Sequence, residues 1–80
     1  MTREEAIHTL NELGLTPVET TAALARKLGI YPMGIELAAK EHRLEAVGAH
    51  AFSIEAVADW LAMEPQYLYN ALERRERKSD

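Results

Sequence analysis

Residues 24–38, LARKLGIYPMGIELA, and residues 57–71, VADWLAMEPQYLYNA, carry the same pattern of apolar and small residues at a shift of 33 positions. Such self-similarity is typical of two copies of one supersecondary unit. Eight positions match without a gap: Leu24 with Val57, Ala25 with Ala58, Leu28 with Leu61, Gly29 with Ala62, Ile30 with Met63, Pro32 with Pro65, Ile35 with Leu68 and Ala38 with Ala71.

The shared pattern is that of a helix-turn-helix. A small residue, Ala25 or Ala58, lets the second helix cross close to the first. The turn then holds Gly29 or its counterpart, followed by an apolar plug, Ile30 or Met63. The pattern predicts at least one helix-turn-helix unit. The alternative is a plain helical bundle, which also needs small residues where its helices cross closely.

Helix start and stop signals divide the rest of the chain. They predict an all-α fold of about five short helices in a single domain, residues 1–80. Residues 44–52 lack a helical signature, and 46–52 form either a minimal β-hairpin wing or a loop. The signals are a capping box at Thr2 and Glu5 with a stop at Gly14, a start at Thr16-Pro17 with a left-handed cap at Gly29, a start at Pro32 with an end near His42, a cap at Ser53, and a start at Pro65.

Composition narrows the class of protein. The chain has 80 residues, 48% hydrophobic and 28% charged, with a net charge of −4 and no cysteine. These values predict a globular domain without disulfides or thiolate chemistry. No apolar run reaches the ~18 residues of a membrane span, so we expect a cytoplasmic protein without a membrane partner. Residues 65–80 hold four basic and three acidic side chains, against five and ten in residues 1–64, so a polyanion would meet the C-terminal end.

Residues 15–61 resemble the small winged helix-turn-helix proteins of the excisionase and MerR-like type. The resemblance implies that the helix from Gly29 towards Arg43-Leu44 enters the DNA major groove and that the following hairpin touches the backbone. The expected wing holds no Lys or Arg, so it adds little to phosphate binding. The residues that carry the resemblance are Leu15-Thr16-Pro17, Leu24-Ala25, Leu28-Gly29-Ile30, Lys40-Glu41-His42-Arg43-Leu44, Ala46-Val47, Phe52-Ser53-Ile54-Glu55 and Trp60-Leu61.

Side-chain chemistry favours a different reading helix. The outward residues expected on the helix from Pro32 include Met33, Glu36 and Leu37, which are poor readers of base edges. The helix from Pro65 offers amide, hydroxyl and guanidinium groups, which suit adenine, phosphate and guanine. We therefore expect DNA contacts from Gln66, Tyr67, Tyr69, Asn70, Arg74, Arg75, Arg77 and Lys78, with Arg26, Lys27, Lys40 and Arg43 as secondary candidates. The alternative is a solvated helix whose basic end complements the helix dipole.

No catalytic or metal-binding pattern is present in the sequence. The histidines His8, His42 and His50 share no ligand spacing, and no serine has a plausible base. We expect neither enzymatic activity nor a metal or cofactor. The leading hypothesis is a sequence-specific regulator of double-stranded DNA, a repressor of the kind found in phages, plasmids or bacterial chromosomes, binding a palindrome as a homodimer. Met33 and Leu37 would then be covered by the partner chain. The alternative is a protein-interaction module, a small phage-type inhibitor or adaptor.

Overall fold

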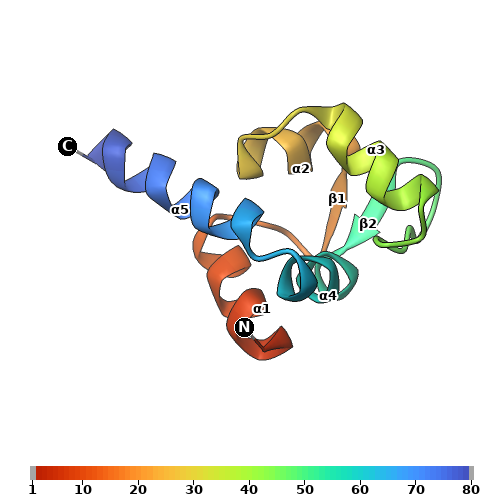
Figure 1. Ribbon diagram of the computed structural model, residues 1–80, viewed down its shortest axis with the longest axis horizontal. Helices are drawn as coiled ribbons and strands as arrows, with labels where there is room; N and C mark the ends of the chain where they lie inside the picture. Colours follow the sequence, from red (N-terminus) through yellow and green to blue (C-terminus); the bar gives the residue numbers. More distant parts are fainter. Residues whose placement is uncertain (1, 80) are drawn as a thin grey trace.

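The computed structural model describes residues 2–79, with side chains for residues 2–74. In this part of the chain five helices surround a two-stranded antiparallel sheet (Figure 1). The expectation of a mainly helical fold with about five helices is confirmed, and the structure adds one small sheet. The elements are α1 (Arg3–Glu12), β1 (Val18–Thr20), α2 (Thr21–Leu28), α3 (Pro32–Lys40), β2 (Ala51–Ser53), α4 (Ile54–Met63) and α5 (Gln66–Ser79).

Three helix boundaries follow the predicted capping signals. The Glu5 amide donates to Thr2 Oγ1 at 3.2 Å, which starts α1. Gly29 ends α2 at φ 68°, a left-handed conformation that glycine adopts without strain. The Ala56 amide donates to Ser53 Oγ at 3.2 Å, which starts α4.

The start of α2 was predicted wrongly. Residues Thr16 and Pro17 precede a strand, and the helix begins only after Thr20, whose Oγ1 accepts from the Ala23 amide at 3.2 Å. The sequence signal was ambiguous because a proline fits an extended segment as well as a first helical turn. Pairing with β2 decides the outcome, since the Ile54 amide donates to the Pro17 carbonyl at 2.9 Å.

Of the two alternatives left open for residues 46–52, a β-hairpin wing or a loop, the structure is nearer the second, a turn that leads into strand β2. Strand β2 pairs with the distant β1, while residues 48–51 form a tight turn closed by the bridge between Gly48 and Ala51. His50 enters this turn at φ 58°. The segment between α3 and α4 thus completes the sheet with β1, instead of forming a separate hairpin.

The sheet joins the two repeats through their equivalent strands. The shift of 33 residues carries Glu19 onto Phe52, and these two residues pair with each other at the centre of the register. The flanking hydrogen bonds are equivalent too: the Thr21 amide donates to the His50 carbonyl, and the Ile54 amide to the Pro17 carbonyl. In Figure 1, β1 runs up into α2 and β2 runs down into α4, so the two helices leave opposite ends of the strand pair.

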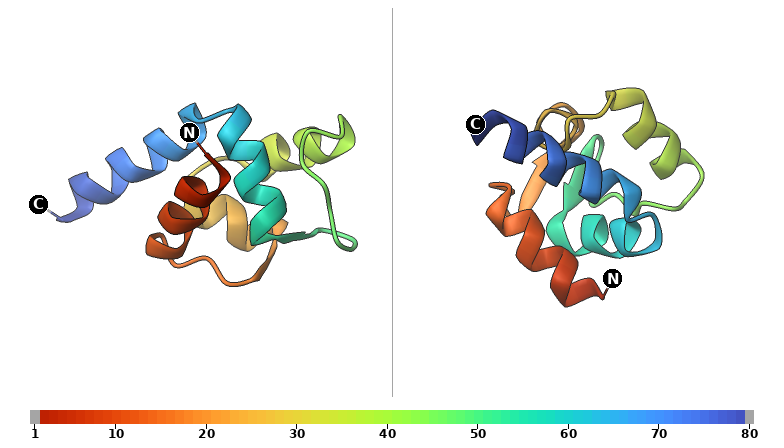
Figure 2. Two further views of the ribbon diagram at one scale, coloured as in Figure 1. Left: turned by 90° about the horizontal axis from the view of Figure 1, so that it is seen from below. Right: turned by 60° about the vertical axis from the view of Figure 1, so that its left-hand side comes forward.

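A single core lies between the helices. Helix α1 packs on α4 and α5 packs on α2, and the views of Figure 2 show the C-terminal end of α5 extending beyond the body. Trp60 is buried, as expected for the one tryptophan, and its Nε1 donates to Glu64 Oε2 at 2.6 Å. The repeat contributes most of the fully buried residues: Leu24, Leu28, Ile35, Ala38, Val57, Ala58, Leu61 and Leu68.

The turns of the two repeats differ. Gly29 and Ile30 form the turn after α2, and Ile30 is half-buried against the core. In the second repeat Ala62 and Met63 are still helical, and α4 ends at Glu64. Met63 is exposed, so its expected role as an apolar plug is wrong, because the longer α4 turns this side chain towards solvent.

Candidate functional site

Helix α5 separates an inner apolar side from an outer polar side. Leu68 and Ala71 are buried, and Tyr67 packs its ring against Trp60 with centroids 5.2 Å apart. Tyr67 is half-buried, which differs from the outward position expected from sequence. The reason is Trp60, whose ring on α4 offers the first turn of α5 an aromatic contact.

The remaining predicted residues on α5 are grouped as expected wherever the structure describes their side chains. Gln66, Tyr69, Asn70 and Arg74 are exposed. Gln66 and Asn70 are four residues apart, as are Asn70 and Arg74, so the three lie along one face of the helix. We call Gln66, Tyr69 and Asn70 the polar face of α5. The side chains of Arg75, Arg77 and Lys78 lie outside the described residues.

Arg74 has a structural contact as well as an exposed position. A Cβ atom placed on Gly29 would overlap the Arg74 guanidinium, so this group lies directly on the end of α2. The last carbonyls of a helix carry partial negative charge, which a cation stabilises. Arg74 therefore links the projecting part of α5 to the body of the molecule.

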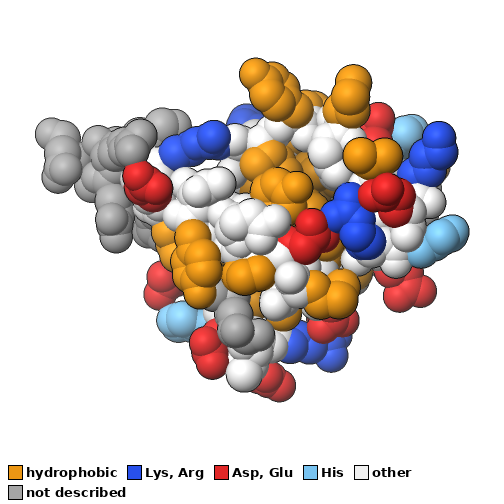
Figure 3. Space-filling view, in the orientation of Figure 1, with side chains coloured by type: hydrophobic (Ala, Val, Ile, Leu, Met, Phe, Trp, Pro, Cys, Tyr) orange, Lys and Arg blue, Asp and Glu red, His pale blue; other side chains and the backbone are white. Residues whose placement is uncertain are grey.

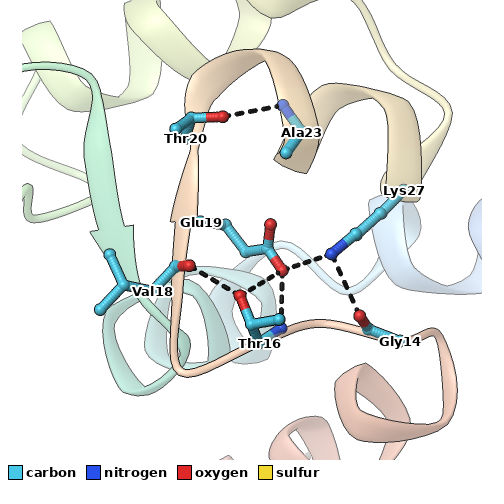
Figure 4. A network of polar contacts seen from close by, with 7 residues as sticks. All are labelled: Gly14, Thr16, Val18, Glu19, Thr20, Ala23 and Lys27. Atoms are coloured by element: carbon cyan, nitrogen blue, oxygen red, sulfur yellow. Dashed lines mark hydrogen bonds and ion pairs between the residues drawn. The ribbon is translucent and has the colours of Figure 1, made fainter.

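Of the four secondary candidates, two are held in ion pairs. Lys27 Nζ donates to Glu19 Oε2 at 2.6 Å and to the Gly14 carbonyl at 3.1 Å (Figure 4). The Arg43 guanidinium forms ion pairs with the carboxylates of Glu41 and Glu64. These contacts join the end of α3 to the end of α4. The other two candidates, Arg26 and Lys40, are exposed.

The buried carboxylate of Glu19 was not singled out from sequence. Its side chain is 4% exposed, and Oε2 also lies within hydrogen-bond distance of the amide and hydroxyl of Thr16 (Figure 4). Burial acts to raise the pKa of Glu19, but the hydrogen bonds from Lys27 and Thr16 outweigh it and lower this pKa below its ordinary value. The cluster fixes the chain between α1 and β1, and we assign it a structural role.

A second candidate surface lies beside α5. An open groove of about 800 Å³ runs between the turn after α2, helix α3 and helix α5. The exposed fractions of Tyr31, Met33 and Leu37 along it are 86%, 76% and 49%. Figure 3 shows hydrophobic side chains gathered at the top of the molecule, over this turn and α3. The sequence predicted that these side chains point outward. It did not predict the groove, because the other wall of the groove is formed by α5.

Within residues 2–79, no helix is both long and apolar enough to cross a membrane. The described side chains also form no group of three or more histidines and carboxylates that would hold a metal ion.

Comparison with protein-family models, curated proteins and solved structures finds no match for this chain. Two surfaces of the molecule therefore bear on its function. One is a polar helix face beside a basic segment, and the other is an apolar groove.

Proposed function

We propose that this chain is a small DNA-binding regulator of the helix-turn-helix type, a repressor that reads a palindromic operator as a homodimer. The observation that carries the proposal is the polar face of α5, on the side of the helix opposite its buried residues. Helices α4 and α5 form the reading unit, and α2 and α3 form a second unit of the same kind that supports it.

Groups on the polar face suit the edges of bases. The amides of Gln66 and Asn70 can each make two hydrogen bonds with adenine in the major groove. The Tyr69 hydroxyl can donate to a base or a phosphate. All three residues are exposed, so the face is available to a ligand as it stands.

Charge favours the same end of the molecule. The four basic residues after position 65 stand on α5, beyond the polar face, whereas the remainder of the chain is acidic. Phosphate contacts supply most non-specific affinity, so Arg75, Arg77 and Lys78 would position the helix while the polar face reads bases, and Arg74 stays at the end of α2. A single short helix reads few base pairs, so useful specificity requires two copies on two half-sites.

The test is a selection from random duplex DNA, followed by fluorescence anisotropy at two salt concentrations. We expect enrichment of a palindrome and binding that weakens steeply with salt. Asn70→Ala should lose about 1–3 kcal/mol of binding to the selected site and relax its specificity. Lys78→Ala should weaken all sequences about equally and reduce the salt slope by about 1.

Arg3→Ala serves as the matched control, since Arg3 is an exposed cation on α1 and is not among the residues proposed to contact DNA. It should leave the affinity and the salt slope nearly unchanged. Equal losses by Asn70→Ala on selected and random DNA would overturn the assignment of the polar face.

The second candidate is a protein-interaction module, and the apolar groove is the observation that favours it. Such a module needs no counterion release, so any DNA binding would be weak and no sequence would be enriched. The same selection therefore separates the two functions.

A further inference from the structure

The apolar groove is not required by the folding of the repeat. Met33 and Leu37 stand on the outer side of α3, whose inner residues Ile35 and Ala38 are already buried. At the equivalent positions of α5 the chain has Gln66 and Asn70. The same helical unit thus exists in this molecule with a polar outer face, and the apolar face of α3 needs another explanation.

The groove also carries one charge of each sign. Arg74 lies at its turn end, against Gly29, and Glu36 lies further along α3. Neither forms an ion pair with any side chain among residues 2–74. A two-fold axis across the groove would bring Glu36 of one copy to Arg74 of the other, and the reverse, because each end meets its opposite in a symmetric interface.

We propose that a second copy of this chain closes the groove, with the two α3 helices packed against each other around a two-fold axis. Tyr31, Met33 and Leu37 form the apolar centre, and the pair of Glu36 and Arg74 contacts forms the rim. This arrangement follows the usual anatomy of an interface, with an aromatic and apolar core inside a charged boundary. The inference deepens the proposed function, because it names the surface through which the regulator dimerises.

Charge complementarity is what selects a second copy over other occupants. A foreign helix would need its own matched charges, whereas the groove already contains both members of the pair. A stable dimer of ordinary size buries about 800 Å² on each copy. The three exposed apolar side chains lie together and supply the centre of such a patch.

The first test is sedimentation equilibrium without DNA, over a range of protein concentrations. The wild type should dimerise. The double variant Met33→Gln, Leu37→Asn gives α3 the residues that α5 carries at equivalent positions, so the fold should tolerate it. Its dimerisation should weaken roughly 100-fold, while its circular dichroism stays unchanged and its urea midpoint matches the wild type at concentrations where both are monomers. Gln66→Met with Asn70→Leu is the matched control on α5 and should leave the wild-type dimer affinity in place.

The second test exchanges the charges. Glu36→Arg and Arg74→Glu should each weaken dimerisation by about 10-fold or more, because like charges then face one another across the axis. The variant with both changes should recover most of the loss. Recovery requires that the two residues meet between copies, since they form no ion pair within one copy.

Each other outcome overturns the inference. A monomer at all concentrations excludes the dimer. A dimer insensitive to all these changes uses another surface. Failure here is distinct from failure of the proposed function: a monomer that still selects a DNA site disproves only the dimer surface, and a dimer that selects none disproves only DNA reading.

Discussion

Residues 18–40 and 51–73 build the same strand, helix, turn and helix, yet they present opposite chemistry to solvent. Equivalent positions are buried in both, as Leu28 and Leu61 illustrate. The outer face of α3 is apolar, with Met33 and Leu37, whereas that of α5 is polar, with Gln66 and Asn70. The buried positions therefore specify the shared unit. The outward side chains can differ between the two copies without changing the fold.

The largest predicted effect tests whether the two units share one core. Leu28→Ala and Leu61→Ala each remove a fully buried side chain, so each should destabilise the protein by about 2–5 kcal/mol through lost burial and a residual cavity. Urea unfolding followed by circular dichroism should show one cooperative transition for both variants. Two separate transitions would mean that the units fold independently and do not share one core.

The next effect concerns the centre of the strand register, where Glu19 of the first unit pairs with Phe52 of the second. Glu19→Gln removes the charged partner of Lys27 and should cost about 2 kcal/mol at neutral pH. Because folding lowers the pKa of Glu19, its contribution is present above the ordinary value of 4.5 and is lost as the pH falls from there through the folded pKa.

Urea midpoints at several pH values measure this contribution. Wild-type stability should fall on acidification more steeply than that of Glu19→Gln. Glu45→Gln, at an exposed position, is the control and should follow the wild-type curve. Parallel curves for the wild type and Glu19→Gln would show that the cluster adds no pH-dependent stability.

The smallest effect distinguishes the two turns. Gly29→Ala places a side chain at φ 68° and against Arg74, so it should cost about 1–2 kcal/mol. Ala62→Gly changes a residue inside α4 and should cost about 0.5–1 kcal/mol by loosening the helix. Thermal melts of the two variants measure both values. A neutral Gly29→Ala would show that the first turn does not need its left-handed residue.

Local signals were sufficient for most helices but not for the sheet. Caps such as Thr2 and Ser53 act within four residues, so sequence alone predicted them. Strand β1 has only three residues and is stabilised by β2, more than thirty positions away, so Thr16-Pro17 was mistaken for a helix start. Extending the repeat by four residues would have placed Thr20 on Ser53 and indicated the true cap.

The candidate sites were predictable to a similar extent. Helical spacing was enough to predict that Gln66, Tyr69 and Asn70 are exposed together. It could not predict that Tyr67 turns towards Trp60, nor that α5 forms a wall of the apolar groove, because both depend on how distant helices pack. Whether the polar face reads DNA stays a prediction until binding is measured.

The pairing of Glu19 with Phe52 at the centre of the sheet bears on how neighbouring molecules can misassemble. Two first units from different molecules could align their β1 strands in the same antiparallel register that β1 and β2 use. That alignment would bring two Glu19 carboxylates into direct opposition, with Cβ atoms about 5 Å apart and both side chains buried. Like charges directly opposite each other destabilise a strand pair, and the ion pair of each Glu19 with its own Lys27 reduces this cost without removing it. A glutamate at the centre of the register therefore makes β1 a poorer partner for another β1 than for β2, where the opposing residue is the uncharged Phe52.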